Sequence, residues 1–233
     1  MARNLWCFSK FNLQSPRSWG FKSEIHVDMG CGSNPRNPFG AEELIGVDIL
    51  PDISVNSFQN FKYLQVLPGE EFPIQDESVD SISGFDFIEH LPRGSSVETN
   101  LFISFMNESS RILKRGGVLL LVTPAFPSPA AFQDPTHVNF ISVNTVNYFI
   151  GNQPEATKLG YGFNGRFSLV SQQWVGPFTR VWETIPLMNL TGQSIKPTKL
   201  KTLVRILKRL KSIRSCQSAL RNPTHLLWVL QKI

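Results

Sequence analysis

The 233-residue chain is long enough to bury the core of one domain. Its hydrophobic fraction of 41% and charged fraction of 18% are ordinary for a globular protein, and it has no apolar run of about 18 residues, the length of a membrane-spanning helix. Its three cysteines, Cys7, Cys31 and Cys216, are odd in number and widely scattered, which argues against a disulfide framework and for a reducing compartment. The N-terminus lacks the continuous apolar core of a signal peptide. We therefore expect a cytoplasmic protein.

The formal net charge of +5 is unevenly distributed. Residues 196–233 contain ten Lys or Arg and no Asp or Glu, so the preceding residues hold 13 basic and 18 acidic side chains. The basic character therefore belongs to the tail, and we expect no nucleic-acid partner. We divide the chain into a lead-in (1–23), one main domain (24–195) and a basic helix with a last strand of the same domain (196–233). The lead-in either covers a ligand or is a poorly ordered terminus.

A strand followed by a glycine-rich turn begins the main domain. Residues 24–28 have the β-branched apolar pattern of a strand and lead into Gly30-Cys31-Gly32-Ser33. Glycine permits a positive φ and leaves no side chain between the backbone and a ligand. A second apolar run, 44–49, contains Asp48, which lies 20 positions after Asp28. This pattern is typical of a nucleoside site, in which the second acid accepts hydrogen bonds from ribose hydroxyls.

Two interpretations of this turn are possible, one with a dinucleotide ligand and one with S-adenosylmethionine. The dinucleotide fingerprint requires glycine at position 35, where the chain has Pro35. The pattern Asp28-x-Gly30-x-Gly32 instead resembles the first motif of class I S-adenosylmethionine-dependent methyltransferases, although Asn34 replaces the usual third glycine. The resemblance implies that the two glycines let the backbone approach the cofactor, that Asp28 faces its amino-acid end, and that Asp48 holds the ribose hydroxyls.

Two further segments carry the same resemblance. Residues 73–92 are similar to the run around the family's fourth strand and end in Glu89-His90-Leu91. A predicted helix over 100–113, a Lys-Arg-Gly-Gly stop and a buried strand over 118–122 complete a match that spans 24–124. One departure is that Leu67 and Pro68 follow the third strand (63–67), where the family usually has an acid beside the adenine.

The resemblance implies an α/β fold, an open and mostly parallel Rossmann-like sheet with helices on both faces and a basic C-terminal helical segment. It also implies S-adenosyl-L-methionine as cofactor, with Ile49 and Phe85 flanking the adenine or ribose and Asp86 lining the cofactor. Beyond this match, we expect a loop over 125–141, a short helix within 142–151, and strands over 167–175, 180–187 and 225–231.

Two of the four histidines are predicted at the ligand-binding edge of the sheet. His137 lies in the loop after strand five, beside Asp134 and Thr136, and is our candidate catalytic base toward the acceptor. His90 follows strand four and is the alternative, with packing at a helix start as its simpler role. His26 is expected in the core. No metal-ligand spacing is evident, so we expect no metal.

Residues 199–214 predict a basic amphipathic helix, with leucines on one face and Lys201, Arg205, Lys208 and Arg209 on the other. Such a helix either packs on its own domain or lies on an anionic membrane surface, which would place the protein peripherally at the inner face of a membrane.

We expect a methyltransferase acting, at oxygen, on a small molecule, a sugar or a lipid-linked saccharide. The saccharide follows from resemblance alone, because bacterial enzymes with this Glu-His-Leu and Asp-Pro-x-His arrangement often serve glycan and cell-surface biosynthesis. The alternative is a catalytically inactive nucleoside-binding module that serves as a membrane-associated partner protein. A dehydrogenase is a third reading, which Pro35 disfavours.

Overall fold

The computed structural model describes residues 23–51, 60–94, 100–175 and 224–233. The lead-in up to residue 22, the strand expected at 180–187 and the basic helix expected at 199–214 lie outside these ranges, so those three expectations stay predictions.

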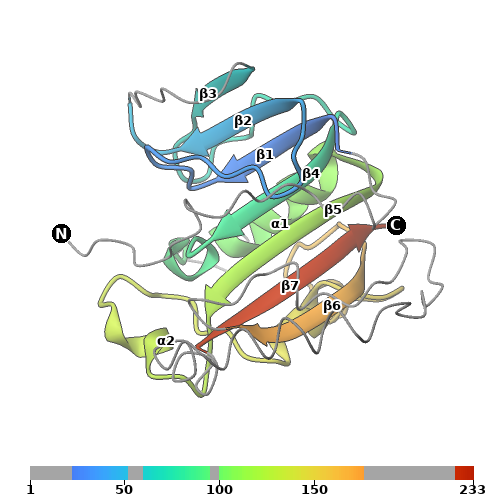
Figure 1. Cartoon of the computed structure of the whole chain (residues 1–233). Coiled ribbons are helices and arrows are strands. Elements are labelled where there is room, and N and C mark those ends of the chain that lie inside the picture. Colours follow the sequence, from blue (N-terminus) through green and yellow to red (C-terminus); the bar gives the residue numbers. More distant parts are fainter. Residues whose placement is uncertain (1–22, 52–59, 95–99, 176–223) are drawn as a thin grey trace, which may run out of the picture.

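A single seven-stranded sheet forms the centre of the protein (Figure 1). Its strand order is β3-β2-β1-β4-β5-β7-β6. The first five strands pair in parallel, whereas β7 is antiparallel to both β5 and β6. The sequence therefore correctly predicted an open, mostly parallel sheet. The strands are β1 Ile25–Met29, β2 Glu43–Asp48, β3 Phe61–Gln65, β4 Val79–Phe85, β5 Leu113–Pro124, β6 Phe167–Val175 and β7 His225–Lys232.

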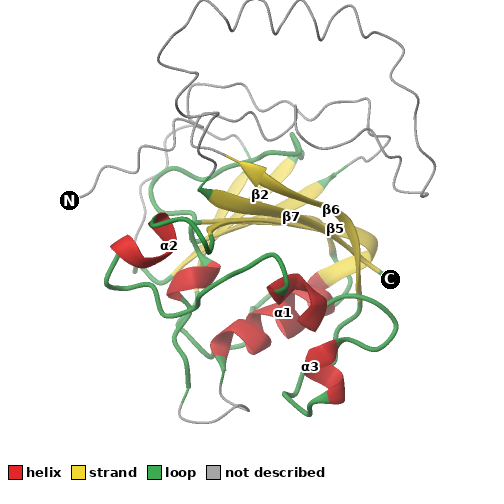
Figure 2. Ribbon diagram, turned by 90° about the horizontal axis from the view of Figure 1, so that it is seen from below, coloured by secondary structure: helices red, strands yellow, loops and turns green. Residues whose placement is uncertain are grey.

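Within the described ranges, three α-helices and two 3-10 turns accompany the sheet. The helices are α1 Leu101–Ile112, α2 Ala130–Gln133 and α3 Glu155–Lys158, and the 3-10 turns are η3 Ile88–His90 and η4 Thr145–Tyr148. Figure 2 shows α1 and α3 on the same side of the sheet. The Asn100 side chain caps α1 by accepting hydrogen bonds from the N–H groups of Phe102 and Ile103. No helix in the described ranges is long and apolar enough to cross a membrane.

Strand β5 is longer than the sequence predicted. We expected residues 114–117 to end the helix, but α1 ends at Ile112 and Leu113 is already extended. The pairing with β4 jumps from Val79–Leu113 to Ser81–Val118, so the chain makes an irregular excursion between the two registers. Gly116, with a φ of 81°, lies in this excursion. Its left-handed geometry is therefore used inside the strand rather than at a helix cap.

Apolar side chains cover both faces of the central strands. In β5, Leu119 and Leu121 point into the larger core, which includes α1, whereas Val118, Leu120 and Val122 point into a second cluster with Phe39 and Phe85. Successive side chains of a strand alternate between faces, so these two clusters lie on opposite sides of the sheet. This explains why the sequence of β5 is apolar without interruption.

The strand order reverses between β1 and β4. The chain runs outward from β1 to β2 and β3 on one side, and β4 and β5 extend the sheet on the other (Figure 1). In open α/β sheets, ligands bind beyond the carboxyl ends of the strands at such a switch point. The glycine turn after β1 and the Asp86–His90 segment after β4 both lie at this edge.

Candidate functional site

The glycine turn begins directly after β1. The N–H of Gly30 donates to the Val47 carbonyl at 2.8 Å and joins the turn to β2. Gly30 has a φ of 64°, and a Cβ built there would lie 2.9 Å from the Phe87 ring. Gly32 has a φ of 52°, and its Cβ would meet nothing within 4 Å among the described residues. The backbone at Gly32 therefore borders open space that a ligand can approach.

Asp48 ends β2 with its carboxylate turned toward the glycine turn. One oxygen accepts a 2.8 Å hydrogen bond from the N–H of Gly32. The other accepts from the N–H groups of Ile49 at 2.8 Å and Leu50 at 3.2 Å. A carboxylate offers about four acceptor positions, so at least one remains for a ligand hydroxyl. The side chain thus shapes the turn and can contact a ribose.

A cavity of about 330 Å³ opens at this edge of the sheet. Its wall includes two predicted contact residues that sit side by side, Asp48 and Ile49, together with Gly30 and Asp86. The side chain of Ile49 is 57% exposed, and its contact with the cofactor stays a prediction. The remaining wall is mostly apolar and comes from the segments after β3 and β4 and from α1.

Glu70 supplies an acid on the cavity wall that sequence reasoning missed. Leu67 and Pro68 occupy the position where an acid was sought, but the chain turns at Gly69 and brings Glu70 back to the same wall. Its carboxylate accepts a 2.9 Å hydrogen bond from the N–H of Leu67. The Pro68-Gly69 pair was a detectable turn signal, and an acid directly after it was the clue.

Asp28 is fully buried beneath the glycine turn and does not line the cavity. Its carboxylate accepts hydrogen bonds from the N–H of Arg36 and from the Ser83 hydroxyl, each at 2.7 Å. Burial raises the pKa of this carboxyl to about 6, although the nearby Arg36 charge opposes the rise. The contact between Asp28 and the amino-acid end of the cofactor stays a prediction.

A chain of hydrogen bonds continues from Asp28 into the sheet. Because Ser83 donates to Asp28, the Nε2–H of His26 donates to Ser83 at 2.9 Å, and its Nδ1 lies 2.7 Å from the Ser81 hydroxyl. Burial lowers the pKa of His26 to about 3, so its ring is neutral. His26 therefore lies in the core, as the sequence predicted.

Phe85 is the last residue of β4, and Asp86 follows it directly. Their side chains lie in different surroundings. Phe85 is buried in the second core cluster, and its ring lies 4.7 Å from the guanidinium carbon of Arg36, so it does not line the cavity. Its contact with the cofactor stays a prediction. Asp86 has a φ of 49°, lines the cavity, and places Oδ1 3.1 Å from Nε2 of His225 on β7.

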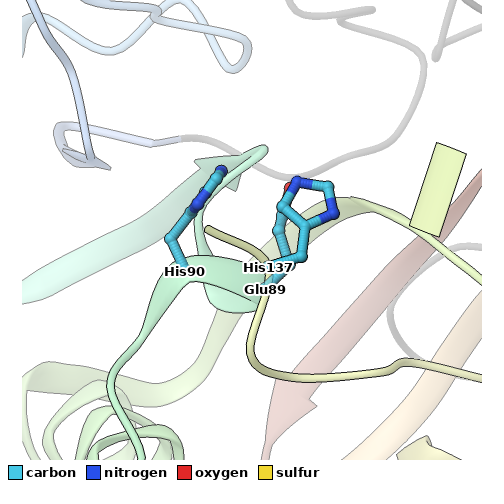
Figure 3. Close-up of side chains that lie close together, drawn as sticks. All are labelled: Glu89, His90 and His137. Carbon is cyan, nitrogen blue, oxygen red and sulfur yellow. The ribbon is translucent and has the colours of Figure 1, made fainter. Parts of the chain in front are cut away.

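His90 and His137, the two histidines predicted at the ligand-binding edge, lie next to each other. The ring centroids of His90 and His137 lie 4.8 Å apart in an edge-to-face arrangement. Figure 3 shows that Glu89 joins them, with its carboxyl beside the His137 ring. One carboxylate oxygen of Glu89 and one ring nitrogen of each histidine all lie within 4.8 Å of one another. Of the three, only His90 lines the cavity.

Hydrogen bonds set the tautomer of both rings. Nδ1 of His137 lies 3.1 Å from the Ala131 carbonyl, which can only accept, so Nδ1 carries the hydrogen. The Thr136 hydroxyl donates to Asp134 at 2.6 Å, so Nδ1 of His90, 3.0 Å from the same hydroxyl, is the donor there. Each neutral ring therefore keeps a lone pair on Nε2. Burial, followed by the proximity of His137, lowers the pKa of His90.

Glu89 is 1% exposed and forms the floor of this cluster. Its Oε2 accepts a 2.9 Å hydrogen bond from the Thr123 hydroxyl, whereas Oε1 has no hydrogen-bond partner among the described residues. Burial, and then the nearby Asp86 charge, raise the pKa of Glu89 to about 8.

Asn139 anchors the loop that carries His137. Its amide nitrogen donates to the carbonyls of Ile88 and Leu91 at 2.8 and 2.7 Å. The N–H groups of Val138 and Asn139 donate to the Glu89 carbonyl. This loop is therefore fastened to η3, which explains why two segments almost 50 residues apart share one cluster. Sequence reasoning missed Asn139, because an amide in a loop carries no distinctive pattern.

Residues 27–121 match the family model described as a methyltransferase domain. A chain of the complex between the Haloferax volcanii Trm112 methyltransferase activator and its methyltransferase shares the fold, with a TM-score of 0.53, 14% identity, and coverage of 98% of this chain and 87% of that chain.

Two S-adenosylmethionine-dependent methyltransferases are also similar in structure. The protein from Mesorhizobium loti has a TM-score of 0.49 at 13% identity, and 91% of each chain is covered. The protein from Archaeoglobus fulgidus has a TM-score of 0.49 at 16% identity, with 92% of this chain and 88% of that chain covered. No curated protein sequence matches the chain.

The matched segment contains every residue that lines the cavity, among them Gly30, Asp48 and His90. Residues 27–121 accordingly carry a methyltransferase domain. This match supports a methyltransferase, and S-adenosyl-L-methionine is the methyl donor that the sequence resemblance implies.

Proposed function

We propose that the methyl acceptor is a hydroxyl group, carried by a small molecule, a sugar or a lipid-linked saccharide. The observation that supports this most strongly is the pair of His90, which lines the cavity, and His137, whose ring centroid lies 4.8 Å from that of His90. A hydroxyl is a weak nucleophile until it loses its proton, so its methylation needs a base or a bound cation at that point. His137 Nε2 can meet the need either by accepting the proton or by binding such a cation.

The residues that bind the cofactor follow from the same edge of the sheet. We propose that Gly30 and Gly32 approach the cofactor through their backbone, that Asp48 holds the ribose, and that Ile49 packs on its flat part. Glu70, which also lines the cavity, is suited to accept a hydrogen bond from an amino group of the base.

Three exposed aromatic side chains favour a saccharide over a charged small molecule. Phe126, Phe132 and Phe140 are each more than 50% exposed and stand on the loop that carries His137. The centroids of Phe126 and Phe132 lie 6.4 Å apart, and those of Phe132 and Phe140 lie 5.2 Å apart. Exposed aromatic faces of this kind mark ligand grooves, and the C–H face of a sugar ring packs well against them.

His137→Ala tests the acceptor-side role. We expect affinity for S-adenosylhomocysteine to stay within a factor of about two, while methyl transfer falls roughly 10²-fold or more, the usual scale for a group that assists proton loss. Transfer of labelled methyl groups to a panel of free sugars, nucleotide sugars and polyprenyl-linked saccharides measures the second quantity. An equal loss of cofactor affinity and transfer would show that His137 acts on the cofactor instead.

We also propose that the basic segment 199–214, which lies outside the described residues, binds an anionic membrane surface where a lipid-linked acceptor is found. Each basic residue near such a surface contributes about 1 kcal/mol. Changing Lys201, Arg205, Lys208 and Arg209 together to Gln should weaken co-sedimentation with anionic vesicles by several kcal/mol at low salt, with little change in thermal stability. Failure of the unmodified protein to co-sediment would contradict the proposal.

A further inference from the structure

Glu89, His90 and His137 bring together two imidazoles and one carboxylate, a set of donors that binds divalent transition metals. One donor atom from each residue lies within 4.8 Å of the other two. The residues come from η3 and from the loop after β5, and Asn139 and the Glu89 carbonyl fasten these segments together. The cluster is therefore assembled by the fold and does not depend on a chance approach of surface side chains.

Both rings are oriented as metal ligands are. In metal sites, the ring nitrogen that does not bind the ion usually donates to a carbonyl, a carboxylate or a hydroxyl, which fixes the tautomer. Nδ1 of His137 donates to the Ala131 carbonyl, and Nδ1 of His90 donates to the Thr136 hydroxyl, which Asp134 holds in turn. Packing alone would not require that both rings keep a free lone pair on Nε2, whereas metal binding does.

The Glu89 carboxyl supplies independent support. It is 1% exposed, Oε2 is held by Thr123, and Oε1 lacks a hydrogen-bond partner among the residues that the structure describes. A buried carboxylate oxygen without a partner is costly. A cation bound to Oε1 and to the two histidines would remove that cost, and Figure 3 shows the carboxyl directed toward the rings.

We propose that Glu89, His90 and His137 bind one divalent first-row transition metal ion, such as Zn²⁺, Mn²⁺ or Fe²⁺. Two imidazoles favour such ions over Mg²⁺ and Ca²⁺, which prefer oxygen ligands. An ion held tetrahedrally at about 2.0–2.1 Å places its ligand atoms about 3.3 Å apart. The donor atoms now lie within 4.8 Å of one another, so binding of the ion requires the two partly buried rings to shift toward the carboxylate.

Three protein ligands leave at least one coordination position for another group. His90 borders the cavity, so that position faces the space between cofactor and acceptor. An acceptor oxygen bound there would release its proton near neutral pH, because a metal ion stabilises the resulting anion. This role rests on the proposed hydroxyl acceptor, whereas the binding of the ion does not.

Calorimetry of the full chain, purified without a histidine tag and stripped with a chelator, tests the inference. The probes are Zn²⁺ alone and Mn²⁺ alone, with Mg²⁺ for comparison. We expect one tight Zn²⁺ site in the unmodified protein, with affinity reduced by at least about tenfold in Glu89→Gln and in His137→Gln. Glu155→Gln is the matched control, since it neutralises a half-exposed carboxylate on α3, and it should bind the ion like the unmodified protein.

Titration with S-adenosylhomocysteine and circular dichroism accompany each variant. Unchanged cofactor affinity with lost Zn²⁺ affinity shows a folded protein that has lost its ion site, and His90→Gln serves in place of any variant that fails to fold. The inference is overturned if the unmodified protein binds neither ion, or if the Glu89 and His137 variants bind as tightly as it does. Cofactor binding without ion binding would contradict the metal site and leave the proposed function standing. Ion binding without cofactor binding would contradict the proposed function and leave the metal site standing.

Discussion

The Asp48 carboxylate has a structural role and lies where a ligand can reach it. It accepts hydrogen bonds from the N–H groups of Gly32, Ile49 and Leu50 and also lines the cavity. The turn and the proposed ribose contact therefore involve the same side chain. A substitution here is informative only when the loss of the ligand contact is separated from the loss of the turn.

Asp48→Ala should weaken binding of S-adenosylhomocysteine without unfolding the protein. Losing charge-assisted hydrogen bonds to the ribose costs on the order of 1.5–3 kcal/mol, or roughly 10- to 10²-fold in the dissociation constant. Calorimetry measures the affinity and thermal unfolding measures the stability.

Asp48→Asn is the matched comparison, because it keeps one acceptor oxygen for the turn while removing the charge, and we expect an intermediate affinity. An unchanged dissociation constant in Asp48→Ala would remove Asp48 from the cofactor site.

The elements show how far sequence reasoning extends. Strands β1, β2, β4 and β7 were predicted within about two residues, and β6 at its observed bounds, because alternating or continuous apolar runs report burial directly. The third strand was placed two residues late, since Phe61 and Lys62 belong to it. These two residues pair with β2, and sequence pattern alone does not reveal where such pairing starts.

The acceptor side was predicted less completely than the cofactor side. Gly30, Asp48 and Ile49 belong to one local motif, which predicted that they would share an edge of the sheet, and all three line the cavity. The cluster of Glu89, His90 and His137 depends on the docking of two segments, which no local spacing encodes. The sequence-based expectation of no metal therefore rested on spacing alone. The fold brings together three possible ligands that this spacing does not reveal.

The hydrogen-bonded chain between β1 and β4 predicts an acid-sensitive fold. Burial lowers the pKa of His26 to about 3 in the folded protein, whereas the ordinary value of 6.5 applies in the unfolded chain. Between these two pH values, His26 is protonated in the unfolded chain and neutral in the folded protein. Stability is therefore lost as the pH falls from 6.5 toward 3. His26→Gln keeps groups that can pair with Ser81 and Ser83 and removes the titration.

We expect the free energy of unfolding of the unmodified protein to fall relative to that of His26→Gln by roughly 2–3 kcal/mol between pH 7 and pH 4.5. Urea titrations at the two pH values measure this difference. The Asp28 carboxyl, with its pKa raised to about 6, acts in the opposite direction in both proteins, so it cancels in the comparison. Parallel pH dependences of the two proteins would show that His26 is not held neutral.

At the scale of the whole molecule, the proposed cofactor-binding and acceptor-side residues come from different parts of the chain. The matched methyltransferase segment, 27–121, provides the glycine turn, Asp48, Asp86 and the Glu89-His90 pair. The loop with His137 and the antiparallel strands β6 and β7 follow it, and His225 on β7 reaches back to Asp86. We infer that the common part of the fold binds the cofactor and that the later segments select the acceptor.

The proposed cofactor site and the proposed acceptor site differ in what defines them. The switch point of the sheet, where we propose that the cofactor binds, is defined by the strand order. The acceptor site depends on one loop, its aromatic side chains and the residues fastened to η3, and loops vary more than the elements that they connect.

Calorimetric titration of the full chain with S-adenosylhomocysteine, and separately with NAD, tests the central claim most directly. The structure predicts one S-adenosylhomocysteine bound per chain and no detectable binding of NAD, because Pro35 replaces the third glycine of a dinucleotide site. Asp48→Ala provides the internal control that the heat arises from this cavity. Absence of S-adenosylhomocysteine binding, or tighter binding of NAD, would contradict the account.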